Sequence, residues 1–419
     1  MMNKFITIIF LIAFTATFAQ EELSLADCYS LAELNHPIAK QNALIPQQNE
    51  LKTDILYTKK YPKIDLDAQA TYQSEVIGFP VENPGLLFES PNKDQYRATV
   101  TVNQLIYGGG TINAAIEEEI SKSKTQQQMV QVELYQLKPK INQLYFSILL
   151  IQEKRDLLLA KQNQLEEKLS EVKAGIKYGV VLPSSDAVLE AELLKLNQEL
   201  KELVSNKLNL VQTLEKYLGV RIGERTTLAY PEHSENLTGS VSRPELDLFN
   251  LQKDQVDFSS DIISKNKRPK LYGFAQGGIG NPGMNPLENA FVPFYYVGVK
   301  LNWNVFDWNK SKKQKESLEI NKLFIDTEKE QFELNNSIQL EQQEIEINKY
   351  KDFTISDQSI IDLHKKILKT ADSQLKNGVI TSSVYIEKLT DLYQAENNLK
   401  THQIQLLLSQ ANYKTIQGI

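Results

Sequence analysis

The chain carries one structural pattern twice, and this duplication restricts its fold more than any other feature. In each copy two short segments alternate apolar with polar residues, and the second leads into a much longer segment with helical spacing. A period of two is typical of a strand with two different faces, whereas apolar residues every seven positions are typical of helices in coiled-coil packing. We therefore expect two structural repeats of about 200 residues, with two strands in each.

The four strands are expected at about 64–74, 95–107, 270–278 and 294–306. The clearest pattern runs from Tyr96 to Tyr107, where apolar and polar positions alternate. One face of these strands carries Val100, Val102, Val297, Val299, Leu301 and Trp303. The opposite face carries Arg97, Thr99, Thr101, Asn103, Lys300 and Asn302. Such a sheet would meet an apolar environment on one side and water on the other.

Long helices are expected at about 111–176 and 307–376, each roughly 100 Å long at the α-helical rise. Pro139 lies within the first and is expected to bend it, because proline lacks a backbone donor. After turns at 177–183 and 377–382, helices return at about 184–218 and 383–416, and another is expected at about 244–267. The repeats then occupy 20–230 and 231–419.

Residues 1–19 read as a signal peptide, with Lys4 before an apolar run and small residues around Ala19. Beyond Ala19 no apolar stretch approaches about 18 residues, so an insertion into a membrane would require a β-barrel.

The net charge of −7 argues against nucleic acid as a partner. Cys28 is the single cysteine and is expected to be a small apolar residue of an N-terminal helix.

Four strands are too few to close a barrel, for which about eight are needed. An open sheet would leave unpaired backbone groups in lipid, so several copies of the chain must combine. In that assembly the valine-rich face would meet lipid and the polar face would line a wet lumen.

Five motifs carry a resemblance to a known family: LSLADCYSLAELNHP, YPKIDLDAQATY, NQLIYGGG, YGVVLPSSDAVLEAE and LEKYLG. In their order and duplication they resemble the TolC family of outer-membrane efflux proteins, over essentially the whole mature chain. The resemblance implies a transmembrane β-barrel closed by trimerisation, joined to a long α-helical coiled-coil tunnel. It also implies passive passage of substrate through the channel of a tripartite efflux or type I secretion system. The implied partners are outer-membrane lipid, a periplasmic adaptor (membrane fusion protein) and an inner-membrane transporter.

In that family, acidic residues just after the helical turns ring the periplasmic mouth. Asp186 and Glu387 stand at comparable positions and are the constriction candidates, whereas Val384 departs from the family pattern. Asp186 also has an ordinary interpretation as an acidic residue in the first turn of a helix.

A second class of function is a periplasmic coiled-coil adaptor or structural spacer without a barrel. This alternative would explain the heptads and the signal peptide, but it leaves the four alternating strands without a role. An enzyme is poorly supported, because the four histidines share no ligand spacing and no nucleophile and base are grouped. We therefore expect no catalytic residue, no metal site and no cofactor.

Overall fold

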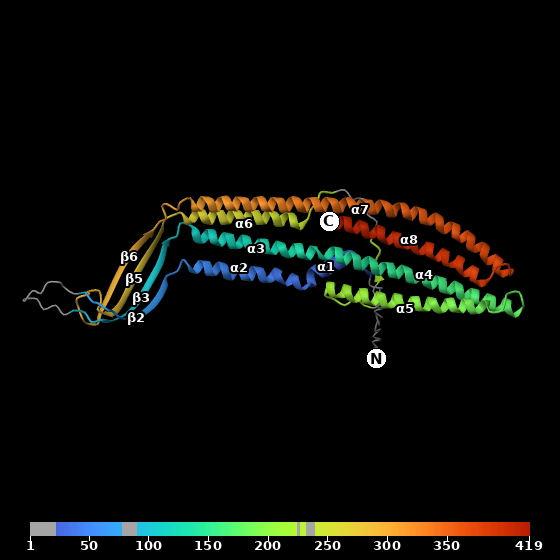
Figure 1. Cartoon of the computed structure of the whole chain (residues 1–419), viewed down its shortest axis with the longest axis horizontal. Helices are drawn as coiled ribbons and strands as arrows, with labels where there is room; N and C mark the ends of the chain where they lie inside the picture. Colours follow the sequence, from blue (N-terminus) through green and yellow to red (C-terminus); the bar gives the residue numbers. More distant parts are fainter. Residues whose placement is uncertain (1–21, 78–89, 224–226, 232–238) are drawn as a thin grey trace, which may run out of the picture. The chain divides into compact units, whose positions relative to one another are not determined.

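The computed structural model describes residues 22–77, 90–223, 227–231 and 239–419 (Figure 1). The expected signal peptide at 1–19 lies outside the described residues. The chain forms two compact units, and each combines segments that are far apart in the sequence. The first unit, named here the sheet unit, consists of the described parts of Lys40–Val132 and Pro244–Leu334. The second, named here the bundle unit, consists of the described parts of Met1–Ala39, Glu133–Arg243 and Asn335–Ile419. Each unit therefore draws on both expected repeats.

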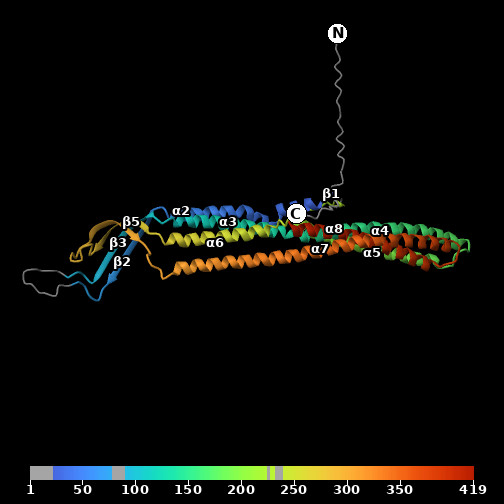
Figure 2. The same cartoon turned by 90° about the horizontal axis from the view of Figure 1, so that it is seen from above.

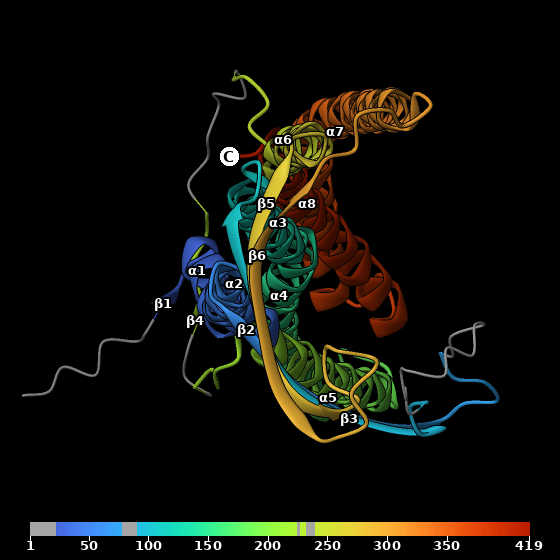
Figure 3. The same ribbon diagram turned by 90° about the vertical axis from the view of Figure 1, so that its left-hand side faces the viewer.

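The sheet unit contains one antiparallel sheet with the strand order β2-β3-β5-β6. Its strands are β2 (Lys63–Tyr72), β3 (Asp94–Tyr107), β5 (Lys270–Asn281) and β6 (Val292–Asn302). Figure 3 shows the four strands as one curved layer.

Strand β6 ends at Asn302, earlier than the expected end at about 306. Asn302 pairs with Lys270, the first residue of β5, so no partner strand remains for the residues that follow. Trp303 consequently lies past the strand end, where its indole N–H donates to the carbonyl of Lys267 at 3.0 Å. The expectation that Trp303 lies within a strand is wrong for this reason.

Four helical segments of the sheet unit lie side by side in the order α2, α3, α6, α7 (Figures 1 and 2). They are α2 (Gln41–Thr58), α3 (Thr111–Tyr135), α6 (Pro244–Asn266) and the first part of α7 (Lys310–Lys376). Polar contacts join the neighbours: Lys52 with Glu119 at 2.8 Å, Ser259 with Glu118 at 2.7 Å, and Lys253 with Asp326. This order matches the strand order, because each strand adjoins one of these helices in the sequence.

The helix expected at 111–176 is divided in two. Helix α3 ends at Tyr135, and α4 (Leu137–Lys177) begins after Gln136. Pro139 cannot donate a hydrogen bond to the residue four positions earlier, which is Tyr135. The break places the proline in the first turn of α4, where a missing N–H is tolerated.

The bundle unit is built on α4, α5 (Ser185–Leu218), the later part of α7 and α8 (Ser382–Gln417) (Figure 2). All four helices contribute to one apolar core, which includes Leu158, Leu165, Val172, Leu189, Leu196, Ile361, Leu368, Leu375, Tyr385 and Leu389. Leu158, Leu165 and Val172 of α4 follow one another at intervals of seven residues. The seven-residue spacing is thus the spacing of a buried helix face.

A smaller set of elements precedes and joins these helices. The 3₁₀ helix Pro37–Lys40 precedes α2, and β1 (Glu22–Leu23) pairs in parallel with β4 (Thr227–Leu228). The hydroxyl oxygen of the fully buried Tyr145 lies 2.9 Å from the carbonyl oxygen of Leu23 and 2.5 Å from that of Ala229, so its single proton is shared between the two acceptors. Cys28 is fully buried in α1 (Leu25–Asn35), and burial raises the pKa of its thiol to about 12. Its thiol is therefore neutral and acts as a packing group.

Candidate functional site

The strand register brings the six polar candidate residues of the sheet to one face. Residues directly opposite each other in antiparallel strands project to the same side. Thr101 stands opposite Gln276, which stands opposite Tyr296. Lys300 stands opposite Tyr272, which pairs with Leu105, two positions beyond Asn103. Arg97, Thr99, Thr101, Asn103, Lys300 and Asn302 therefore share one side, named here the polar face.

The polar face also holds an aromatic and amide cluster that was not predicted. Gln276 Nε2 donates to Thr101 Oγ1 at 2.8 Å, and the hydroxyl of Tyr296 donates to Gln276 Oε1. The rings of Phe274 and Tyr296 are 5.9 Å apart at their centroids, and the Arg97 guanidinium lies 5.7 Å from the centroid of Phe294. Glycines interrupt the alternation of apolar and polar residues in β5, so the sequence pattern of this strand is hard to recognise. Phe274 and Gln276 are two positions apart and therefore lie on the same face, and this spacing was the hint of the cluster in the sequence.

Gly278 allows the close approach of β3 and β5 at the centre of this face. A Cβ at Gly278 would lie 2.2 Å from the carbonyl oxygen of Ala98 and 2.8 Å from Thr99 Cγ2. Thr99, directly opposite, is only 5% exposed. A side chain at position 278 would therefore push the two strands apart.

The other side of the sheet, the apolar face, is rich in exposed aliphatic side chains. Val100, Val297, Val299 and Leu301 are exposed there, Val102 is half-buried, and Ile64, Leu66 and Tyr295 extend the same exposed surface. Val299 is 71% exposed. A contiguous apolar surface of this kind marks a contact with another protein or with a membrane. Trp303, just past β6, is also exposed.

The two acidic candidates lie at one end of the bundle unit. A Cβ at Gly378, in the turn before α8, would lie 3.0 Å from the carbonyl oxygen of Val180, in the turn before α5, so the two turns touch. Asp186 is half-buried in the first turn of α5, where its carboxylate accepts a hydrogen bond from the N–H of Ala187 at 2.9 Å. Glu387 is exposed on α8 and pairs with Lys388 at 2.7 Å. Both carboxylates thus come shortly after a turn in the sequence. Among the described residues, Asp186 and Glu387 form no hydrogen bond with each other.

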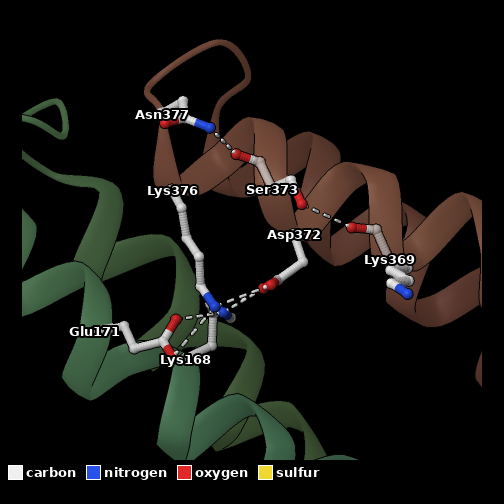
Figure 4. Close-up of polar contacts among 7 residues, drawn as sticks. All are labelled: Lys168, Glu171, Lys369, Asp372, Ser373, Lys376 and Asn377. Atoms are coloured by element: carbon white, nitrogen blue, oxygen red, sulfur yellow. Dashed lines mark hydrogen bonds and ion pairs between the residues drawn. The ribbon is translucent and has the colours of Figure 1, made fainter.

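Beside these turns lies a network of charges that was not predicted (Figure 4). The ammonium of Lys168, from α4, is buried and pairs with Glu171 and with Asp372 of α7. Lys376 pairs with Asp372 at 3.1 Å and with Glu171 at 3.8 Å. Figure 4 shows Lys168 and Lys376 converging on the carboxylates of Glu171 and Asp372.

Lys168 and Asp372 both remain charged at neutral pH. Burial opposes the charged form of Lys168, but its bonds with Asp372 and Glu171 outweigh that effect and leave its pKa raised. Burial likewise opposes the charge of Asp372, but the bonds from Lys168 and Lys376 leave its pKa lowered. The network therefore joins α4 and α7 through ionised groups.

Lys161 forms a similar buried contact one heptad before Lys168. Its ammonium pairs with Glu192 of α5 at 3.0 Å and lies 3.3 Å from the hydroxyl of Thr390 on α8. Because Lys161 and Lys168 are seven residues apart, the sequence indicates that they lie on the same face of the helix. The acidic and hydroxyl groups that they contact become known only from the packing of the helices.

The described residues hold no group of three potential metal ligands. His402 Nδ1 lies 2.6 Å from Asp357 Oδ2, whereas His233 falls outside the described residues.

Among the helices in the described ranges, none is at once long enough and apolar enough to cross a membrane.

Comparison with solved structures gives close likenesses in fold. The outer membrane channel CmeC of Campylobacter jejuni matches with a TM-score of 0.65 at 14% identity, over 94% of this chain and 85% of that chain. The open state of the Neisseria gonorrhoeae outer membrane channel MtrE matches with a TM-score of 0.67 at 13% identity, over 94% and 89%. The outer membrane protein VceC of Vibrio cholerae matches with a TM-score of 0.65 at 12% identity, over 94% and 96%. The chain therefore has the fold of these outer membrane proteins.

A comparison of the sequence with protein-family models found no match, and neither did a comparison with curated proteins.

Proposed function

We propose that this protein is the outer-membrane channel of a tripartite efflux or type I secretion system. The observation that carries the proposal is the division of one sheet into a polar face and an exposed apolar face. A sheet with one face in lipid and the other in a water-filled lumen needs this arrangement. The fold likeness to outer membrane channels supports the same function.

In the proposed assembly three copies of the chain close one barrel. Strands β2 and β6 are the edges of the four-stranded sheet, and three such sheets would supply twelve strands. Joining β6 of one copy to β2 of the next would satisfy the unpaired backbone groups of both edges. Val100, Val102, Val297, Val299 and Leu301 would then face lipid, with Trp303 at the interface, and the polar face would line the lumen.

The helices would form a coiled-coil tunnel across the periplasm, entered through the turns before α5 and α8. Asp186 and Glu387 would ring this entrance in the homotrimer and favour cations there. The channel itself would be passive, because an inner-membrane transporter, linked through a periplasmic adaptor, would drive the substrate. The chain would therefore act without a catalytic group or a cofactor of its own.

The test compares lysine substitutions on the two faces of the sheet. Val299→Lys should block insertion into the outer membrane, because a lysine on the lipid side of a barrel costs about 2–4 kcal/mol near the bilayer centre. Thr101→Lys, on the polar face, should leave insertion unchanged. Insertion is measured by membrane fractionation and by the yield of heat-modifiable trimer on gels.

The result also separates the channel from the second candidate, a periplasmic coiled-coil adaptor or spacer. The apolar core shared by α4, α5, α7 and α8 would serve such a spacer as well. Val299 is exposed in the single chain, so a spacer would accept lysine equally well on both faces and would fractionate with the soluble periplasm. Equal tolerance of the two variants would therefore refute the channel.

A further inference from the structure

The bundle unit contains a cavity of about 1000 Å³ between α4, α5 and the segment 219–223. Ile151, Leu203, Leu208, Val211 and Ile222 are among the aliphatic side chains that line it. A volume of this size lies at the upper end of the range for small-molecule sites in proteins.

The polar groups of this cavity are mostly cationic. Arg155, Lys207, Lys216 and Arg221 line it together with a single acidic residue, Glu215. Arg155 pairs with its neighbour Asp156 at 3.2 Å, whereas the other three cations form no ion pair with any described residue. Burial, with a contribution from Arg155, lowers the pKa of Lys207. Four cationic side chains thus stand beside this apolar surface, against two acidic ones, Glu215 in the lining and Asp156 next to Arg155.

The single lining acid has a structural task of its own. Glu215 Oε1 accepts a hydrogen bond from the backbone N–H of Ile222 at 2.8 Å. Gly219 ends α5 with a φ of 68°, and its N–H donates a hydrogen bond to the carbonyl of Glu215 at 2.9 Å. These bonds fold the segment 219–223 back over the helix end, so the cavity wall is formed in advance.

One more polar group of the cavity lacks a partner. The side-chain oxygen of Gln152 is buried and accepts no hydrogen bond from any described residue. A buried amide without a partner is costly, so a ligand that bonds to it would gain free energy. Because a carboxamide offers both an acceptor and two donors, rotation of its end can present an N–H to an anion.

We propose that this cavity binds an amphiphilic anion, a molecule with one acidic head group and an apolar chain, such as a fatty acid. The head group would lie between Lys207 and Arg155, and the chain would lie along Leu203, Leu208 and Ile222. The excess of cations over acids provides the charge complementarity, and the aliphatic lining provides the surface for the chain. This inference concerns the bundle unit alone and does not rest on the proposed channel function.

The test is photo-crosslinking of the full mature chain, purified in a buffer with a non-ionic detergent so that it does not depend on insertion into a bilayer. The probe is dodecanoic acid with a diazirine at the chain end, and labelled peptides are located by mass spectrometry. Label is expected within 203–223. Unlabelled dodecanoate should compete for this site, whereas dodecanol, which has the same chain and no charge, should not.

Variants then test the charge and the apolar lining separately. Lys207→Gln should lower the affinity for dodecanoate about tenfold, as expected for one lost charge-assisted hydrogen bond. The matched control is Lys201→Gln, on the exposed side of the same helix, which should bind as the unchanged chain does. Leu208→Gln should also weaken binding, and circular dichroism of each variant verifies that the helices are intact.

Three results would overturn the proposal. The first is the absence of label within 203–223 above the level found in the rest of the chain. The second is equal competition by dodecanol, which would mean that the cavity binds apolar chains without regard to charge. The third is an equal effect of Lys207→Gln and Lys201→Gln.

Discussion

The buried Lys168 network leads to an asymmetric prediction about two substitutions. Asp372→Asn removes a carboxylate and leaves the ammonium of Lys168 with Glu171 as its remaining acidic partner among the described residues. Lys168→Met removes the ammonium and leaves both carboxylates paired with Lys376. We expect Asp372→Asn to be the more damaging, because it strands the buried charge rather than the exposed ones.

The side-chain exposures set the sizes of these effects. The Lys168 side chain is 7% exposed, whereas those of Asp372 and Glu171 are 31% and 48% exposed. Loss of a charged partner from a buried group costs about 1–3 kcal/mol, so Asp372→Asn should lower the local free energy of opening by that amount. Lys168→Met should cost less than about 1 kcal/mol, because water and Lys376 compensate the remaining carboxylates.

The measurement is amide hydrogen exchange of peptides from the ends of α4 and α7, followed by mass spectrometry. Since about 1.4 kcal/mol corresponds to a tenfold change in an opening equilibrium, a loss of about 1–3 kcal/mol in Asp372→Asn should speed exchange there about fivefold to 150-fold. Lys168→Met should change it much less. If Lys168→Met has an equal or larger effect, the network does not stabilise this end of the bundle through the buried ammonium.

The same network predicts how protection depends on pH. The pKa of Asp372 lies below its usual 3.8, so its contribution is present above pH 3.8 and is lost as the pH falls through the lowered value. The pKa of Lys168 lies above its usual 10.5, so its contribution is present below pH 10.5 and is lost as the pH rises through the raised value. After correction for intrinsic exchange, the contributions of Asp372 and Lys168 to protection should be constant between pH 3.8 and pH 10.5. The variant Asp372→Asn should lack the loss of protection that Asp372 causes at acid pH.

Two further predictions concern single positions. Gly278→Ala should disrupt the pairing of β3 with β5 and lower the yield of assembled protein. The control Gly277→Ala should be tolerated, because a Cβ at position 277 would meet its nearest atom at 3.7 Å. Equal yields of the two variants on gels would contradict this prediction. Tyr145→Phe should lower the local opening free energy by about 1–3 kcal/mol, since it leaves the carbonyls of Leu23 and Ala229 without this donor. Exchange of the peptides around β1 and β4 measures this effect, and unchanged protection would show that water replaces the hydroxyl.

Local patterns in the sequence were enough to predict where several elements form. Backbone geometry sends neighbouring residues of a strand to opposite faces, so the alternation at Arg97–Asn103 predicts a two-faced strand, and β3 contains it. The spacing of Leu158, Leu165 and Val172 predicts one buried helix face, and all three lie in the bundle core. Proline chemistry predicted a bend near Pro139, but whether the helix bends or ends there depends on its surroundings.

The sequence by itself therefore determined the two-faced strands and the heptad helices, because both follow from the geometry of neighbouring residues. Only the tertiary structure decided which strands pair and in which register, and so which residues share a face. It also decided the end of β6 before Trp303, since that depends on where β5 begins. The partners of Lys168 and the cavity beside Lys207 depend on side chains that packing brings together from distant segments. Such contacts leave no periodic signal in the sequence, because each depends on the packed positions of whole helices rather than on neighbouring residues.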